Sequence, residues 1–230
     1  MPKKRTPKAV SVDTPSKSVE DFLKAVYSLQ QAVERVSTNA LADHLAVKAP
    51  SVTDMARRME GAGLIHYKKY HGVRLTEQGE RMALMVIRRH RLIELYLMQE
   101  LGYELRDVHA EAERLEHAVS DQFIEAVDQK LGHPDIDPHG DPIPSPEGYV
   151  APSASIPLTE LPLNTAARIS RLLASSPELL QHVVDREFRL GDEVEVTTRD
   201  PFHGPLAVLV NGRREILGYT VAACIHVDVV

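Results

Sequence analysis

The side chains with the clearest potential for chemistry lie within residues 88–121, RRHRLIELYLMQELGYELRDVHAEAERLEHAVSD. His90 and Glu94 are one helical turn apart. A second group has spacings that place it on one face of a single predicted helix: His109, Glu113, Glu116 and His117. Clustered carboxylates repel one another, and a divalent cation relieves that repulsion. The two groups together predict a metal site, and the alternative interpretation is a solvated helix face.

Composition limits the classes of protein that need to be considered. The chain has 230 residues, of which 43% are hydrophobic and 26% charged, which predicts a soluble protein with one large or two ordinary domains. It has no apolar run near the ~20 residues of a membrane span and no apolar stretch typical of a signal peptide, so we expect a cytoplasmic protein without membrane contact. The single cysteine, Cys224, excludes an intrachain disulfide and a zinc site made of several thiolates of this chain.

Charge is distributed unevenly along the chain. The net charge is −6, yet residues 1–80 hold 13 Lys and Arg against 9 Asp and Glu, whereas residues 81–230 hold 14 against 24. A basic first third on an acidic body is typical of a DNA-binding domain joined to a sensing or oligomerising domain.

The beginning of the chain combines a basic arm with a helix. Residues 1–17 contain five basic residues and three prolines, which favours a flexible arm. Residues 18–31 then have helical periodicity, and Ser18 with Asp21 resembles a capping box, which would place Asp21 in the first turn. The Asp21 carboxylate either complements the helix dipole or is a metal ligand.

Residues 37–63 have the pattern of a helix-turn-helix. The first short helix follows Ser37 or Thr38, and the second begins near Pro50, which is favoured in the first turn. The second helix is predicted to turn outward the side chains that suit a recognition helix in a major groove. Candidates for base contacts are Pro50, Ser51, Thr53 and Asp54, and candidates for phosphate contacts are Arg57 and Arg58.

Residues 64–76 predict two short strands joined by a tight turn. The turn carries Lys68, Lys69 and Tyr70, a basic tip that suits contact with DNA phosphate. A hairpin after a recognition helix is typical of a winged helix, which we assign to residues 18–80.

Two long amphipathic helices are predicted next, over residues 77–99 and 106–131. Their apolar surface exceeds what a winged helix needs, which predicts a homodimer through a helical dimerisation and metal-binding domain at 81–147. Eight prolines within 132–162 exclude long regular elements, and we place a linker at 148–162. Residues 163–230 read as short β-branched strands with a hairpin turn at Asn211-Gly212, which predicts a small SH3-like β-barrel.

At this point the chain resembles the diphtheria toxin repressor family of metal-dependent transcriptional regulators, including its manganese-sensing branch. The resemblance begins near Ser18 and is strongest in RRHRLIE, VHAEAERLEHAVSD and PHGDPIP. It implies a mainly α protein with an N-terminal winged helix-turn-helix, a helical dimerisation domain and a C-terminal SH3-like β-barrel. It also implies metal-activated binding of a homodimer to palindromic double-stranded operator DNA, and repression of metal-uptake genes.

The resemblance also implies two sets of metal ligands. The primary set falls on Asp21, Glu113, Glu116 and His117, and the ancillary set falls on His90, Glu94 and His109. In manganese sensors the residue matching His90 can also join the primary set. Two departures concern Lys24, where some manganese sensors have a glutamate, and Arg171 with Ala174, where the family has a glutamate and a glutamine ligand from the barrel domain. Glu178 and His182 are the candidate replacements.

Ligand chemistry favours Mn²⁺, with Fe²⁺ as the alternative, because oxygen-rich sites with a histidine suit these ions. Two other functions stay open. A metallohydrolase could use the same cluster, but it would leave the winged helix unexplained, so we expect no enzyme and no small-molecule substrate. A winged-helix regulator that senses an organic ligand would make the His/Glu cluster structural.

Overall fold

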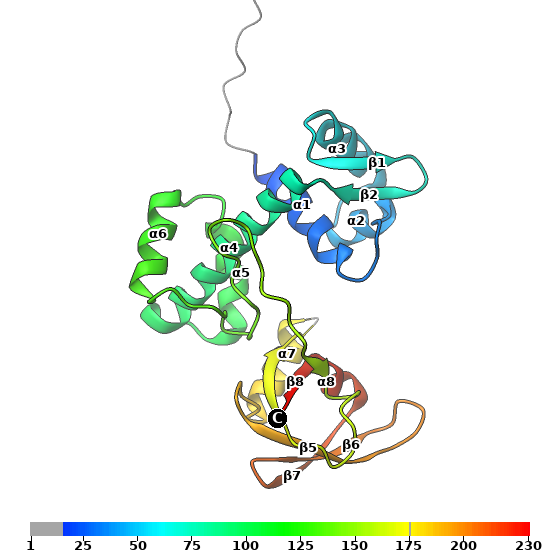
Figure 1. Cartoon of the computed structure of the whole chain (residues 1–230), viewed down its shortest axis with the longest axis vertical. Coiled ribbons are helices and arrows are strands. Elements are labelled where there is room, and N and C mark those ends of the chain that lie inside the picture. Colours follow the sequence, from blue (N-terminus) through cyan, green and yellow to red (C-terminus); the bar gives the residue numbers. More distant parts are fainter. Residues whose placement is uncertain (1–15, 175) are drawn as a thin grey trace, which may run out of the picture. The chain divides into compact units, whose positions relative to one another are not determined.

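The computed structural model describes residues 16–174 and 176–230, which divide between Leu84 and Met85 into two compact units; Figure 1 labels their helices and strands. The predicted arm at 1–17 lies outside the described residues except for its last two. None of the described helices combines the length and apolar character that a membrane span requires.

The first unit is a winged helix, as predicted. It contains α1 (Lys17–Gln30), α2 (Thr38–His44), α3 (Ala49–Gly61), β1 (Ile65–Lys68) and β2 (Gly72–Leu75). The Ser37 hydroxyl accepts a hydrogen bond from the Ala40 amide at 3.1 Å and so caps α2. Apolar residues at helical spacing on all three helices, among them Phe22, Leu41 and Val52, form one buried core with the strands.

The predicted capping box at Ser18 is wrong. Helix α1 already begins at Lys17, and its N-cap is Ser16, whose side chain makes no capping hydrogen bond. Ser18 is therefore inside the helix, and Asp21 lies in its second turn. The sequence was ambiguous here because Ser16 and Ser18 are both residues of the type favoured at an N-cap.

The wing packs against the segment between α1 and α2. Val36 forms a β-bridge with Val73, and β1 pairs with β2 from Ile65 opposite Leu75 to Lys68 opposite Gly72. Gly72 has φ +90°, and a Cβ at this position would lie 2.3 Å from the Val36 carbonyl oxygen. Only glycine satisfies both conditions, so Gly72 fixes the approach of the wing to this segment.

The helical part of the second unit differs from the prediction in one break. Helix α4 (Glu77–Leu101) runs on from the first unit, but residues 106–131 form two helices, α5 (Leu105–Leu115) and α6 (Asp121–Lys130). Ser120 ends the continuous helix, because its hydroxyl accepts from the Phe123 amide at 3.2 Å and caps α6. Glu116 is consequently the C-cap residue of α5, and His117 lies in the following turn. The four predicted ligands from 109 to 117 do not share one uninterrupted helix.

Two arginines of α4 hold the Pro-rich segment. Arg88 is buried, donates to the Pro144 carbonyl at 2.8 Å and pairs with Asp128 at 2.9 Å. Arg91 donates to the Pro142 carbonyl at 2.5 Å. A segment that prolines exclude from helix and sheet thus satisfies its carbonyl groups with side chains of a helix.

The C-terminal part is the predicted SH3-like β domain. Its sheet has the order β3-β8-β4-β5-β6-β7 among the described residues, and all pairings are antiparallel. The strands are β3 (Ile156–Pro157), β4 (Ala167–Leu172), β5 (Glu193–Arg199), β6 (Leu206–Val210), β7 (Arg213–Leu217) and β8 (Ile225–Val229), with helices α7 (Pro177–Asp185) and α8 (Tyr219–Cys224). In α8, Ala222 and Cys224 are buried in the core of this domain.

Candidate metal centre

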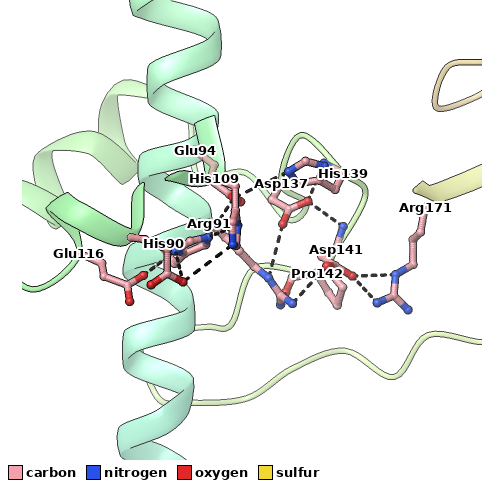
Figure 2. A network of polar contacts seen from close by, with 11 residues as sticks. His90, Arg91, Glu94, His109, Glu116, Asp137, His139, Asp141, Pro142 and Arg171 are labelled. Atoms are coloured by element: carbon pink, nitrogen blue, oxygen red, sulfur yellow. Dashed lines mark hydrogen bonds and ion pairs between the residues drawn. The ribbon is translucent and has the colours of Figure 1, made fainter. Parts of the chain in front are cut away.

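The centre of the candidate site is the Glu94 carboxylate, which is only 1% exposed. Its Oε1 atom lies 2.9 Å from Nε2 of His90 and 3.1 Å from Nδ1 of His109. A third imidazole approaches it from the Pro-rich segment, because Nε2 of His139 lies 3.8 Å from the same oxygen. Figure 2 shows Glu94 with these three histidines around it. The structure thus brings the predicted ancillary residues together and adds His139 to them.

Three separate elements supply these side chains. His90 and Glu94 come from consecutive turns of α4, and His109 comes from α5. The chain reverses between these helices at Gly102, whose φ of +71° favours glycine. His139 comes from residues 137–141, here called the DPHGD loop. In this loop Oδ1 of Asp137 accepts the amides of His139 and Asp141, both at 2.8 Å.

His90 links this group to the other carboxylates. Its Nδ1 atom lies 2.5 Å from Oε2 of Glu116 and 3.9 Å from Oε1 of Glu113. The Glu116 carboxylate, in turn, lies 3.1 Å from Nε2 of His117. The helix break after Leu115 therefore does not remove Glu116 and His117 from the cluster. Asp21, the remaining predicted ligand, belongs to the first unit, so its role in the primary set stays a prediction.

Electrostatics at the cluster favour a charged carboxylate at its centre. Burial alone would raise the pKa of Glu94, but its hydrogen bonds with His109 and His90 and its ion-pair contact with His139 outweigh burial and hold this pKa well below its usual range. For His139, burial would lower the pKa, yet its contact with Glu94 and the negative charges of Glu94, Asp137 and Asp141 raise it. Burial and the charges of Asp141 and Glu94 raise the pKa of Asp137 to about 6, against the opposing charges of Arg91 and His139.

The donor set fits a divalent cation. Oε2 of Glu94 is buried and accepts no hydrogen bond within the described part of the chain, an unusual state for a buried carboxylate oxygen. Imidazole nitrogens and carboxylate oxygens are ligands that Mn²⁺, Fe²⁺ and Zn²⁺ all accept. His109 and His139 also line a hollow of about 310 Å³.

Sequence reasoning missed two residues of this cluster. His139 and Asp137 were noticed only as part of the PHGDPIP motif and its surroundings, although a histidine between two aspartates is itself a possible ligand pattern. The predicted replacements Glu178 and His182 lie exposed on α7 and line a separate hollow with Arg106 and Asp107. They do not belong to any group of three or more potential ligands within residues 16–174 and 176–230.

The residues predicted to contact DNA lie on α3 and on the wing of the first unit. On α3, the predicted DNA contacts Pro50, Ser51, Asp54, Arg57 and Arg58 are all exposed. Thr53 is half-buried, and its hydroxyl donates to the Ala49 carbonyl at 3.2 Å, which leaves the oxygen free to accept. Asp54 lies 3.8 Å from Arg57, so the ion pair between these two exposed side chains competes with the contacts that either side chain could make with DNA.

The wing tip is basic and exposed. Lys68, Lys69 and Tyr70 are all exposed, and Tyr70 is 90% exposed at φ +66°. The Lys69 ammonium lies 4.8 Å from the centre of the Tyr70 ring. This geometry keeps two positive charges at the tip of the hairpin.

Models of known protein families match each of the three parts of the chain. The iron dependent repressor N-terminal DNA-binding domain matches residues 15–73, and the iron dependent repressor metal binding and dimerisation domain matches residues 76–145. A FeoA domain matches residues 156–229. A solved manganese-dependent transcriptional repressor in complex with manganese is 35% identical, with a TM-score of 0.86 over 92% of this chain and 100% of that chain. The chain belongs to the diphtheria toxin repressor family.

Relatives in this family carry the names of different metals. The iron-dependent repressor IdeR of Mycobacterium leprae is 28% identical over 224 residues, which cover 92% of this chain and 96% of that protein. The diphtheria toxin repressor of Corynebacterium glutamicum is 29% identical over 206 residues, which cover 85% and 89%. Likeness to both iron and manganese regulators indicates a divalent metal and does not select between the two.

Proposed function

We propose that the protein is a transcriptional repressor whose binding to operator DNA depends on a divalent metal ion, Mn²⁺ in preference to Fe²⁺. The observation that carries this proposal is the buried Glu94 carboxylate with one oxygen toward three imidazoles and the other without a hydrogen-bond donor among the described residues. A site of this kind in a chain that also contains a winged helix supports metal sensing.

The ligands are proposed in two sets. The ancillary set is His90, Glu94 and His109, to which we add His139. The primary set is Asp21, Glu113, Glu116 and His117, with three carboxylates and one imidazole. When bound, the cation supplies positive charge that offsets the repulsion among the clustered carboxylates. The oxygen-rich primary set is the reason for preferring Mn²⁺.

The DNA contacts follow from the outward surfaces of α3 and the wing. Pro50, Ser51, Thr53 and Asp54 are proposed to face base edges. Arg57, Arg58, Lys68, Lys69 and Tyr70 are proposed to hold the phosphate backbone. We also propose a homodimer through the helices at 81–147, which gives two recognition helices for a palindromic operator with half-sites about 34–36 Å apart or a multiple of this.

The test is operator binding by purified, chelator-treated protein, titrated separately with Mn²⁺, Fe²⁺ and Zn²⁺. Salt concentration must be held constant, because phosphate contacts dominate affinity. We expect binding to appear with Mn²⁺ and to disappear with chelator. DNA binding that is the same with and without each metal would refute the proposal and would favour a regulator that senses an organic ligand.

Variants test the ligand assignment in the same assay. Asp21→Ala and His117→Ala should each abolish the response to metal without unfolding the protein. Glu125→Ala is the matched control, because Glu125 is an exposed carboxylate on α6 that accepts a hydrogen bond from Gln129 of the same helix. A full metal response in either ligand variant would show that the primary set is wrong.

A further inference from the structure

The DPHGD loop lies between helix α4, which carries His90 and Glu94, and strand β4 of the C-terminal domain. On its α4 side, Arg91 lies 3.5 Å from Oδ2 of Asp137 and 3.5 Å from Oδ2 of Asp141. The same loop presents His139 to Glu94 at 3.8 Å. These contacts, seen together in Figure 2, bring three loop side chains against one turn of α4.

On its other side the loop contacts the backbone of β4. The Leu172 amide donates to the His139 carbonyl at 2.8 Å. Gly140 has φ +88°, and a Cβ there would lie 2.0 Å from the Ser170 carbonyl oxygen. The loop therefore fits closely against β4 at a position that only glycine allows.

Arg171 of β4 completes the contact. Its Nε atom donates to Oδ1 of Asp141 at 2.8 Å, and its terminal nitrogen donates to the same oxygen. Both side chains are largely buried, with 22% and 19% exposed. The register of β4 against β8 shifts between Ile169 and Arg171, and such a bulge changes the direction of the side chain that follows it. Arg171, Asp141 and Arg91 thus form a continuous chain of charges from β4 to α4.

We propose that Arg171 is a positioning residue of the metal centre: by binding Asp141 it fixes the DPHGD loop and so holds His139 beside Glu94. The inference rests on the proposed metal-sensing function and assigns a task to the C-terminal domain within it. An arginine cannot coordinate a cation, since it has only donors. Here the domain contributes an ion pair that orders a ligand-bearing loop.

The test is Mn²⁺ affinity measured by calorimetry on the full-length protein. An Asp21→Ala background removes one proposed primary ligand, so that the remaining binding reports on the ancillary set. Arg171→Ala should weaken this binding about 10-fold, the usual cost of losing a partner that orients a ligand. Arg171→Lys should lie between Arg171→Ala and the parent, because lysine keeps the charge but not the fork of donors.

Arg168→Ala is the matched control. Arg168 is on the same strand, and it pairs with Glu193 at 2.7 Å on the exposed surface. Its removal should leave Mn²⁺ affinity unchanged. Asp141→Asn provides a second variant that leaves β4 intact, and it should weaken binding as Arg171→Ala does.

Hydrogen exchange in the metal-free protein gives a readout that is independent of the ion. The amides of Gly140 and Asp141, which bond to Asp137, should exchange faster in Arg171→Ala than in the parent. Unchanged Mn²⁺ affinity with unchanged exchange would overturn the positioning role, and so would an equal loss in Arg168→Ala. If the wild-type protein bound no Mn²⁺, the proposed function would fail, whereas exchange at the loop would still report on Arg171.

Discussion

Replacing Asp137 by asparagine should stabilise the metal-free protein at neutral pH. Asp137 is 3% exposed, and its pKa is raised from 3.8 to about 6 by burial and by the charges of Asp141 and Glu94. The folded state therefore binds a proton at Asp137 more tightly than the unfolded state does. Asparagine has nearly the same shape, and its oxygen can still accept the amides of His139 and Asp141.

The magnitude follows from the size of the pKa shift. A shift of about two units corresponds to about 3 kcal/mol of unfolding free energy lost when Asp137 ionises in the folded protein. This loss begins near the unfolded pKa, grows up to about pH 6 and is constant above it. The charge of Arg91, which lies 3.5 Å from the Asp137 carboxylate, already opposes this shift and is included in it, so we expect a gain of up to about 3 kcal/mol at pH 7.5.

Urea unfolding of wild type and Asp137→Asn in the presence of chelator measures the difference. The gain should be about half as large at pH 5 as at pH 7.5, because Asp137 in the wild type is then largely protonated. Asp135→Asn, the same change at an exposed aspartate of the Pro-rich segment, is the matched control. A variant that is less stable at pH 7.5, or a gain that does not change with pH, would refute the reasoning.

The other predictions concern single side chains. His139→Ala should weaken Mn²⁺ binding at least about 10-fold in calorimetry, because loss of a residue that only orients a ligand already costs about 10-fold and loss of the ligand should cost no less. An unchanged affinity would show that His139 is not a ligand. Lys68→Ala should weaken DNA binding to the same extent on all sequences and reduce the salt slope by about 1 in anisotropy titrations; a change that depends on sequence would instead indicate base contact. Gly72→Ala should lower stability by about 2 kcal/mol or more in thermal unfolding, because its φ is +90° and its Cβ would meet the Val36 carbonyl. Gly61→Ala, a helical position with nothing within 4 Å of the added Cβ, is its control and should be slightly stabilising.

Much of the winged helix could be read from the sequence because its determinants are local. Pro50 marked the start of α3, and the helical spacing of Val52 and Met59 accounts for the burial of both on one face of this helix. The pair His90 and Glu94 was predictable for the same reason, since residues four apart on a helix must be neighbours.

The break between α5 and α6 could not be predicted from local sequence spacing. The positions of His109, Glu113, Glu116 and His117 fit the period of an α-helix, but this spacing does not show whether one helix continues from His109 to His117. Helix α5 ends at Leu115 and Ser120 caps α6, so Glu116 and His117 owe their position to the contacts of Glu116 with His90 and with His117 instead of to a shared helix face.

Only the tertiary structure decided which long-range partners complete the site. The Pro-rich segment has neither helical nor strand periodicity, so its sequence determined that it would be irregular and no more. Its path follows from Arg88 and Arg91, which bind its carbonyl groups, and from Arg171, which binds Asp141. The sequence by itself determined the types of the candidate ligands and the DNA-binding motif, whereas the meeting of His139 with Glu94, which are far apart along the chain, depends on contacts that no local pattern encodes.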